Sequence, residues 1–267
     1  MATACTPDFM VVGAMKAGTT TLYRDLLRHP GVFLPTNKEP EVLVHFPTAA
    51  TATAEYAELF KRAGAGQKKG EASTAYTKRP TYEGVAELAR EVCGAIRIIY
   101  LRRDPIERMI SHYKHFLQHG LISGSFAEVV ARDDTLVDYS RYDWQIAPWI
   151  EVFGADAVLQ LDLDDYSRNR RKTLERVIAH IGLDPASTPD VDVQVVANRA
   201  EEAKTISNPV LDRIVASGLY QKRLKPLIPA HAREKLRHLV LPEVASPEID
   251  IPEETLAYIR DKLSQCP

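Results

Sequence analysis

Apolar and polar positions follow two periodicities along the chain. Short apolar runs at 9–12, 95–101 and 157–161 predict buried strands, and a further short strand is expected at about 68–72. Longer segments with apolar residues every three or four positions predict helices at about 19–29, 53–64, 82–92, 105–120, 125–132, 142–153, 168–182 and 252–263. Strands separated by helices predict an α/β fold, a three-layer sandwich in which helices flank a mostly parallel central sheet.

One stretch, 30–52, interrupts this alternation. Four prolines lie in it, and it is predicted to be irregular because proline interrupts helices and sheet ladders. No internal repeat or low-complexity segment divides the chain, and 267 residues suit one large domain. We therefore predict a single domain over 1–267, with a cofactor-binding core at about 9–185 and a helical, basic region on the cofactor or acceptor side at about 195–267.

A glycine-bounded loop follows the first predicted strand. Gly13 and Gly18 delimit it, Thr20 follows, and the next residues have a helical pattern. Such a loop presents backbone N–H groups to phosphate, and this one nearly fits the nucleotide-binding pattern G-x-x-x-x-G-K-[ST]. Thr19 holds the position of the pattern's lysine, and Lys16 lies inside the loop instead. We therefore predict a P-loop-like site for phosphate-like anions that is poorly placed to clasp the outer phosphates of ATP.

A second candidate anion site follows the strand predicted at 95–101. Asp104 suits the N-cap of the next helix, and Pro105 suits its first turn. Arg103 at the strand end and Ser111 eight residues later supply a guanidinium and a hydroxyl near a helix start. Together these groups are suited to binding a dianion.

These two segments resemble the sulfotransferases that use 3′-phosphoadenosine 5′-phosphosulfate (PAPS), in particular the bacterial and heparan-sulfate-type branch. Lys-x-Gly-Thr-Thr after a strand is similar to the family's 5′-phosphosulfate loop, and the arginine and serine are similar to its 3′-phosphate site. The resemblance implies that Arg103 and Ser111 hold the 3′-phosphate, and that Lys204, in a late basic loop, folds over the nucleotide. It further implies that the phosphosulfate is held by Lys16, Ala17, Gly18, Thr19, Thr20 and Thr21.

The resemblance also suggests catalytic groups. Lys16 would stabilise the charge that builds on the bridging oxygen as adenosine 3′,5′-bisphosphate leaves. Glu39, in a Lys-Glu-Pro segment, is the first candidate for the general base, and His45 is the second. Further candidates are Glu71, His112 and His115. No metal is expected, because no other segment adds ligands to the two histidines that lie three residues apart.

Two further segments are similar to the same family. Gly70–Tyr76 resembles its Gly-Glu-x-Ser-x-x-Tyr segment, but Ala72 stands where many relatives carry a lysine. A second lysine that assists the sulfuryl group is therefore not expected from that segment. One helix face resembles the family's Tyr-x-x-x-Leu-x-x-Trp helix and carries Tyr142, Gln145, Ile146 and Trp149.

Composition narrows the class of protein further. The chain is 45% hydrophobic and 26% charged, which is ordinary for a globular enzyme, and its net charge of −2 argues against a general nucleic-acid binder. No apolar run is long enough to span a membrane, and no secretory signal is visible. Three widely spaced cysteines give no disulfide or metal framework, so a cytoplasmic setting is expected.

Three functions remain open from the sequence. The first is sulfuryl transfer from PAPS to a hydroxyl or amine of a small-molecule or carbohydrate acceptor, as in natural-product or glycan sulfation. The second is a P-loop kinase or NTPase, which predicts a lysine directly after Gly18 and a magnesium-binding aspartate at a strand end. The third is a nucleotide-binding relative without catalysis. Neither the acceptor nor the oligomeric state follows from these residues.

Overall fold

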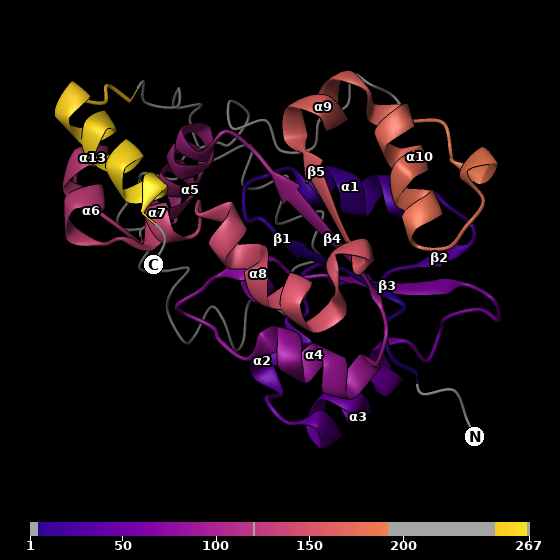
Figure 1. Ribbon diagram of the computed structural model, residues 1–267. Coiled ribbons are helices and arrows are strands. Elements are labelled where there is room, and N and C mark those ends of the chain that lie inside the picture. The colour runs from indigo at the N-terminus through magenta and orange to yellow at the C-terminus, as the bar shows by residue number, and fades with distance from the viewer. Residues whose placement is uncertain (1–4, 120, 192–248, 266–267) are drawn as a thin grey trace, which may run out of the picture.

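A computed structural model describes residues 5–119, 121–191 and 249–265. Its centre is a parallel sheet of five strands in the order β2-β3-β1-β4-β5 (Figure 1). The strands are β1 (Phe9–Gly13), β2 (Val32–Phe33), β3 (Lys68–Ala72), β4 (Arg97–Arg102) and β5 (Val158–Asp162). The predicted α/β class with a parallel sheet is confirmed.

Helices cover both faces of the sheet, which gives the three layers. Figure 1 shows α1, α9 and α10 over one face and α2, α3, α4 and α8 over the other, whereas α5, α6, α7 and α13 gather beyond the carboxyl end of β4. The described helices are α1 (Thr19–Leu26), α2 (Val42–His45), α3 (Ala49–Leu59), α4 (Val85–Cys93), α5 (Pro105–Gln118), α6 (Phe126–Arg132), α7 (Thr135–Asp138), α8 (Tyr142–Phe153), α9 (Leu163–Arg168), α10 (Arg170–His180) and α13 (Glu253–Ser264). Three 3₁₀ turns complete them, at η1 (Thr74–Thr77), η2 (Ala155–Ala157) and η3 (Pro185–Ser187).

The central strands are apolar without alternation because helices bury both of their faces. Every residue of β1 is buried, and β4 is buried from Ile98 to Leu101. Val11 lies opposite Ile99, which in turn lies opposite Leu159 of β5. The sheet therefore holds the carboxyl ends of β1 and β4 side by side, where both predicted anion sites begin.

Two stretches differ from the sequence-based prediction. Segment 30–52 is not wholly irregular, because β2 pairs with β3 and two helices form, the second beginning at Ala49. The hydroxyl of Thr48 accepts a hydrogen bond from the N–H of Thr51 at 3.3 Å and caps α3, so this helix begins before the predicted residue 53. It ends at Leu59, before the predicted residue 64. The single helix predicted over 168–182 is divided, since α9 ends at Arg168 and α10 begins two residues later.

The C-terminal region is described only in part. Lys204 and most of the basic region predicted at 195–267 lie outside the described residues, so the single-domain boundaries remain a prediction. Within the described part, α13 packs on α7, and Nη2 of Arg141 donates to the carbonyl of Lys262 at 2.7 Å. None of the described helices has the length and apolar character needed to cross a bilayer. The cytoplasmic setting stays a prediction of the sequence.

Candidate functional site

The loop between β1 and α1 is built around two glycines that cannot be replaced without strain. A Cβ at Gly13 would lie 2.0 Å from Oγ1 of Thr77, and one at Gly18 would lie 2.5 Å from Cδ1 of Leu163. Gly18 also has a φ of +90°, which favours glycine. Both glycines of the predicted pattern therefore serve the close packing of the loop against η1 and α9.

The amino end of α1 is open. Gly18 is its N-cap, no side chain caps its free N–H groups, and no acidic residue lies in its first turn. An eight-residue helix with an uncapped amino end presents N–H donors and a positive dipole to an anion. Thr19 and Thr21 are buried in this turn, and Thr20 is half-buried. The structure thus assembles the predicted loop as a backbone cradle.

Lys16 lies half-buried inside this cradle, with no hydrogen bond or ion pair of its ammonium among the described residues. Burial lowers the pKa of the Lys16 ammonium, and the neighbouring Arg103 lowers it further, whereas Glu39 opposes the shift. The structure therefore brings Lys16 close to two other residues that the sequence singled out.

Glu39 reaches the site from the segment between β2 and α2. Its N–H donates to the carbonyl of Ala72 at 3.0 Å, which ties the segment to the end of β3. Its carboxylate accepts hydrogen bonds from the Lys38 ammonium and from Oγ1 of Thr74, the latter at 2.9 Å. Burial alone would raise the pKa of Glu39, but Lys38 and Thr74 outweigh burial and lower it. Glu39 is therefore an ionised carboxylate, and its charge acts on Lys16.

Strained backbone occurs in the phosphate loop and in the segment that carries Glu39. Among the described residues, the non-glycine residues with positive φ are Lys16 (+68°), Glu39 (+62°) and Glu41 (+52°). Left-handed backbone at a non-glycine residue costs about 1–3 kcal/mol and persists where the surroundings impose it, often at functional sites. Lys16 and Glu39, the first candidates for charge stabilisation and for the general base, both have this strained backbone.

The second predicted anion site forms at the start of α5. Asp104 caps the helix by accepting from the N–H of Glu107 at 2.9 Å, and Pro105 is its first residue, as predicted. Arg103 donates to Oε2 of Glu107 from Nε at 3.0 Å and from Nη2 at 2.8 Å. Ser111 is buried on α5, and its hydroxyl has no hydrogen bond among the described residues.

Arg108 is a buried cation of the site that the sequence analysis missed. It is 0% exposed, and it donates to Oγ of Ser140 and to the carbonyl of Leu136, both at 2.7 Å. Its Nη1 lies 3.5 Å from the carbonyl of Met15 in the phosphate loop. Burial lowers the pKa of Arg108 to about 10, which leaves it charged at neutral pH. A fixed positive charge with no carboxylate partner among the described residues therefore lies behind the loop.

His112 packs against this cation. Its Nδ1 lies 3.4 Å from Nη1 of Arg108, and its buried Nε2 has no hydrogen-bond partner in the part of the chain that the structure describes. Burial and then Arg108 lower the pKa of His112 to about 2, and burial and then Lys16 lower that of His115 to about 4. Both imidazoles are therefore neutral at pH 7.

The other two candidate bases lie differently. His45 ends α2 with 61% of its side chain exposed, and its Nε2 is 3.4 Å from Oε2 of Glu41. Glu71 is fully buried and accepts hydrogen bonds from the hydroxyls of Ser73, Tyr56 and Tyr76. Burial raises the pKa of Glu71. Its buried carboxylate is occupied by three hydroxyl donors, so Glu71 organises the end of β3.

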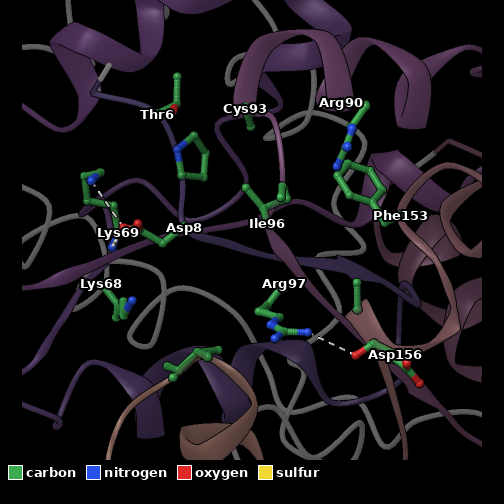
Figure 2. A pocket seen from close by; sticks show the side chains of 15 residues that line it. Thr6, Asp8, Lys68, Lys69, Arg90, Cys93, Ile96, Arg97, Phe153 and Asp156 are labelled. Carbon is green, nitrogen blue, oxygen red and sulfur yellow. Dashed lines mark hydrogen bonds and ion pairs between the residues drawn. The ribbon is translucent and has the colours of Figure 1, made fainter. Parts of the chain in front are cut away.

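A basic cavity of about 620 Å³ lies at the other end of the sheet, where the strands begin (Figure 2). Three of its cations have partners: Lys69 pairs with Asp8 at 3.2 Å, Arg97 donates to the carbonyl of Asp156 at 3.1 Å, and Arg90 donates to that of Gly94 at 3.4 Å. The fourth, Lys68, lies beside Gly182, just after the carboxyl end of α10. Arg97 and Arg90 therefore offset backbone carbonyls, and Lys69 is paired with a carboxylate.

Comparison with known proteins identifies the family. A model described as the sulfotransferase family matches residues 7–187, so the chain belongs to that family. Carbohydrate sulfotransferase 15 of Rattus norvegicus is 24% identical over 251 residues, which cover 68% of this chain and 45% of that protein. The membrane-associated sulfotransferase kil1 of Dictyostelium discoideum is 31% identical over 118 residues, which cover 43% of this chain and 24% of that protein.

A solved structure supports the fold. The sulfotransferase from Alicyclobacillus acidocaldarius superposes with a TM-score of 0.62 at 23% identity, over 73% of this chain and 87% of that one. The chain spans less than half the length of the curated relatives it matches. The sequence-based assignment to the sulfotransferases is confirmed, and the fold agrees with it.

Proposed function

We propose that this protein transfers a sulfuryl group from PAPS to a hydroxyl or amine of a small-molecule or carbohydrate acceptor. The observation that carries the proposal is the position of Lys16 at the open amino end of α1, with no partner among the described residues and with the charge of the ionised Glu39 acting on it. One cation in an anion cradle and one carboxylate beside it supply what sulfuryl transfer requires.

In this proposal, different residues bind the phosphosulfate and the 3′-phosphate of PAPS. The N–H groups at the start of α1, with Lys16, Thr19 and Thr20, hold the phosphosulfate. Arg103 and Ser111 hold the 3′-phosphate. When the phosphate binds, the guanidinium of Arg103 exchanges its ion pair with the half-exposed carboxylate of Glu107 for one with the phosphate. Arg108 adds a buried positive charge behind the loop. No metal is invoked, because these cations can carry the charge of the leaving group.

The reaction is an in-line displacement at sulfur. PAPS supplies the sulfuryl group, a bond forms from the acceptor oxygen or nitrogen to sulfur, and the bond from sulfur to the bridging oxygen breaks. The electron pair leaves with adenosine 3′,5′-bisphosphate, and Lys16 stabilises the charge on that oxygen. Glu39 accepts the acceptor's proton, since it is ionised at neutral pH and its charge acts on Lys16 of the same site.

The proposed class of acceptor is taken from the name of a related protein. Carbohydrate sulfotransferase 15 carries its acceptor class in its name, and we extend that class, together with small molecules, to this chain. The kinase alternative predicts a lysine directly after Gly18, and Thr19 stands there. Family membership does not favour that alternative.

The direct test is transfer of label from [³⁵S]PAPS to a panel of phenols, sugars and amines. We expect a labelled product together with an equal amount of adenosine 3′,5′-bisphosphate. Release of the bisphosphate at the same rate with and without every acceptor would contradict a transferase and leave only hydrolysis.

A further inference from the structure

A further cavity, of about 340 Å³, lies where the carboxyl end of β4 meets the starts of α5 and α8 and the end of α13. The described residues that line it include Arg102, the last residue of β4, and Arg141, which precedes α8. The phosphate loop and the candidate bases contribute none of these lining residues. The volume is that of a site for a small ligand.

The amino end of α8 forms one wall of this cavity. Tyr142, Asp143 and Trp144, the first three residues of the helix, all line it. The helix has 12 residues, and no side chain among the described residues caps its free N–H groups. Such an end presents N–H donors and a positive dipole to an anion, as the start of α1 does in the phosphate loop.

Two buried donors of the lining residues lack an acceptor in the part of the chain that the structure describes. Tyr142 is 9% exposed, and its hydroxyl forms no hydrogen bond. Nε of Arg141 is also buried without a partner, whereas its Nη1 lies 3.3 Å from Oδ1 of Asp138 and its Nη2 donates to the carbonyl of Lys262 at 2.7 Å. Buried donors are costly unless an acceptor satisfies them, so an acceptor is expected here.

Arg102 adds a positive charge that is only weakly paired. Its Nη1 lies 4.0 Å from Oδ1 of Asp143, which is too far for a hydrogen bond, and the two side chains are 41% and 97% exposed. An exposed ion pair of this kind contributes little to stability. The next residue, Arg103, is by contrast bonded to Glu107 through two of its nitrogens. The guanidinium of Arg102 can therefore turn to an anion at small cost.

We propose that this cavity is a second anion site, which binds a phosphate or sulfate group between the amino end of α8 and Arg102, with the hydroxyl of Tyr142 as a further donor. Asp143 is the one carboxylate among the described lining residues, and its charge opposes binding. A free anion and an ester of a larger molecule present the same tetrahedral group, and the test below distinguishes them. The site requires binding alone, so it does not depend on the proposed transfer reaction.

Tryptophan fluorescence can report binding, because Trp144 lines the cavity and the other tryptophan, Trp149, is buried. Inorganic sulfate, inorganic phosphate, glucose 6-sulfate and glucose 6-phosphate are titrated at constant ionic strength, with and without saturating adenosine 3′,5′-bisphosphate. We expect a saturable change that the bisphosphate leaves intact, that sodium chloride does not produce, and that Trp144→Phe removes. Tighter binding of the sugar esters than of the inorganic ions would identify an ester as the ligand, and equal binding a free anion.

The variants locate the site. Arg102→Met should weaken binding about tenfold, the range of a charge-assisted hydrogen bond, and Tyr142→Phe should weaken it less. Asp143→Asn should strengthen binding, because it removes the opposing charge, and its exposed position makes a folding defect unexpected. The matched control is Arg168→Met, an exposed arginine of α9 whose Nη2 lies 3.8 Å from Oδ2 of Asp164.

Other outcomes would overturn the inference. Absence of a saturable change with all four ligands would exclude the site, and loss of the change on adding the bisphosphate would assign the anion to the cofactor loop. Unchanged affinity in both Arg102→Met and Asp143→Asn, or an equal loss in Arg168→Met, would contradict the location. Failure of the proposed function is separate, because it would appear as no transfer from PAPS while these titrations stay as they are.

Discussion

The two ends of the sheet are both basic, yet their positive charges are used differently. At the amino ends of the strands, three of the four cations are bonded: Lys69 to a carboxylate and Arg97 to a carbonyl, both drawn in Figure 2, and Arg90 to the carbonyl of Gly94. At the carboxyl ends, the ammonium of Lys16 has no such partner among the described residues, and it lies at the uncapped amino end of α1. Cations thus indicate an anion site where an unpaired charge coincides with the open amino end of a helix.

The parallel topology explains the difference. Helices of a β-α-β unit begin at the carboxyl ends of strands and end near the amino ends of the next strands. The positive end of α1 therefore adds to the cations at one edge, while the carbonyl of Gly94 after α4 accepts from Arg90 at the other. Four predictions test this account, in order of expected effect.

The largest effect is expected from the phosphate loop. Lys16→Ala should lower kcat/KM for PAPS about 10³-fold, because the charge on the bridging oxygen loses its cation. Arg103→Ala should act mainly through weaker cofactor binding. Steady-state kinetics with varied PAPS measures both, and Lys69→Ala at the opposite edge is the matched control. A comparable loss in Lys69→Ala would break the distinction between the two edges.

The next effect concerns proton transfer. Glu39→Gln keeps the shape of the side chain and its hydrogen bond with Thr74, but it cannot accept a proton. Turnover should fall about 10²-fold with unchanged binding of adenosine 3′,5′-bisphosphate. Single-turnover transfer and calorimetry separate the two quantities. Normal turnover in this variant would move the base to His45, the second candidate of the sequence.

A third variant tests the buried charge behind the loop. Arg108→Met removes the donor to the hydroxyl oxygen of Ser140 and one of the two donors to the carbonyl of Leu136, so the free energy of unfolding should fall by about 2–3 kcal/mol. Urea unfolding measures the change, and Arg62→Met provides an exposed control. Equal stabilities of the two variants would show that Arg108 is not part of the framework of the loop.

The smallest effect is a pH dependence of stability. The pKa of His112 is about 2 in the folded protein, below its ordinary value of 6.5. Below pH 6.5 the unfolded chain therefore binds a proton that the folded protein does not, and stability is lost as the pH falls. One such proton contributes about 1.4 kcal/mol per pH unit. In urea unfolding between about pH 4 and 5.5, His112→Asn should show a slope shallower by about this amount. Identical slopes would contradict the buried, neutral imidazole.

Local spacing was enough to predict the loops of the site. The phosphate loop between Gly13 and Thr20, and the helix start at Asp104, depend on residues adjacent in the chain, and both formed as predicted. The strands at 9–12 and 95–101 were recognised by their apolar runs, because both faces of the central strands are buried. The roles of these residues toward PAPS remain proposals.

Long-range contacts account for what the sequence did not reveal. The strand β2 has two residues and exists through its pairing with β3, which no local pattern encodes. The sequence analysis did not single out Arg108, since its acceptors at Leu136 and Ser140 lie about 30 residues further on.

The central claim is that the loop of Lys16 binds a phosphosulfate-type nucleotide rather than a nucleoside triphosphate. Calorimetric titration of the protein with adenosine 3′,5′-bisphosphate, beside ATP with magnesium, tests it directly. Micromolar binding of the bisphosphate without binding of ATP is the result that the account predicts. Preference for ATP would contradict it and make the displaced lysine a variant of a kinase loop, and binding of neither nucleotide would contradict it as well.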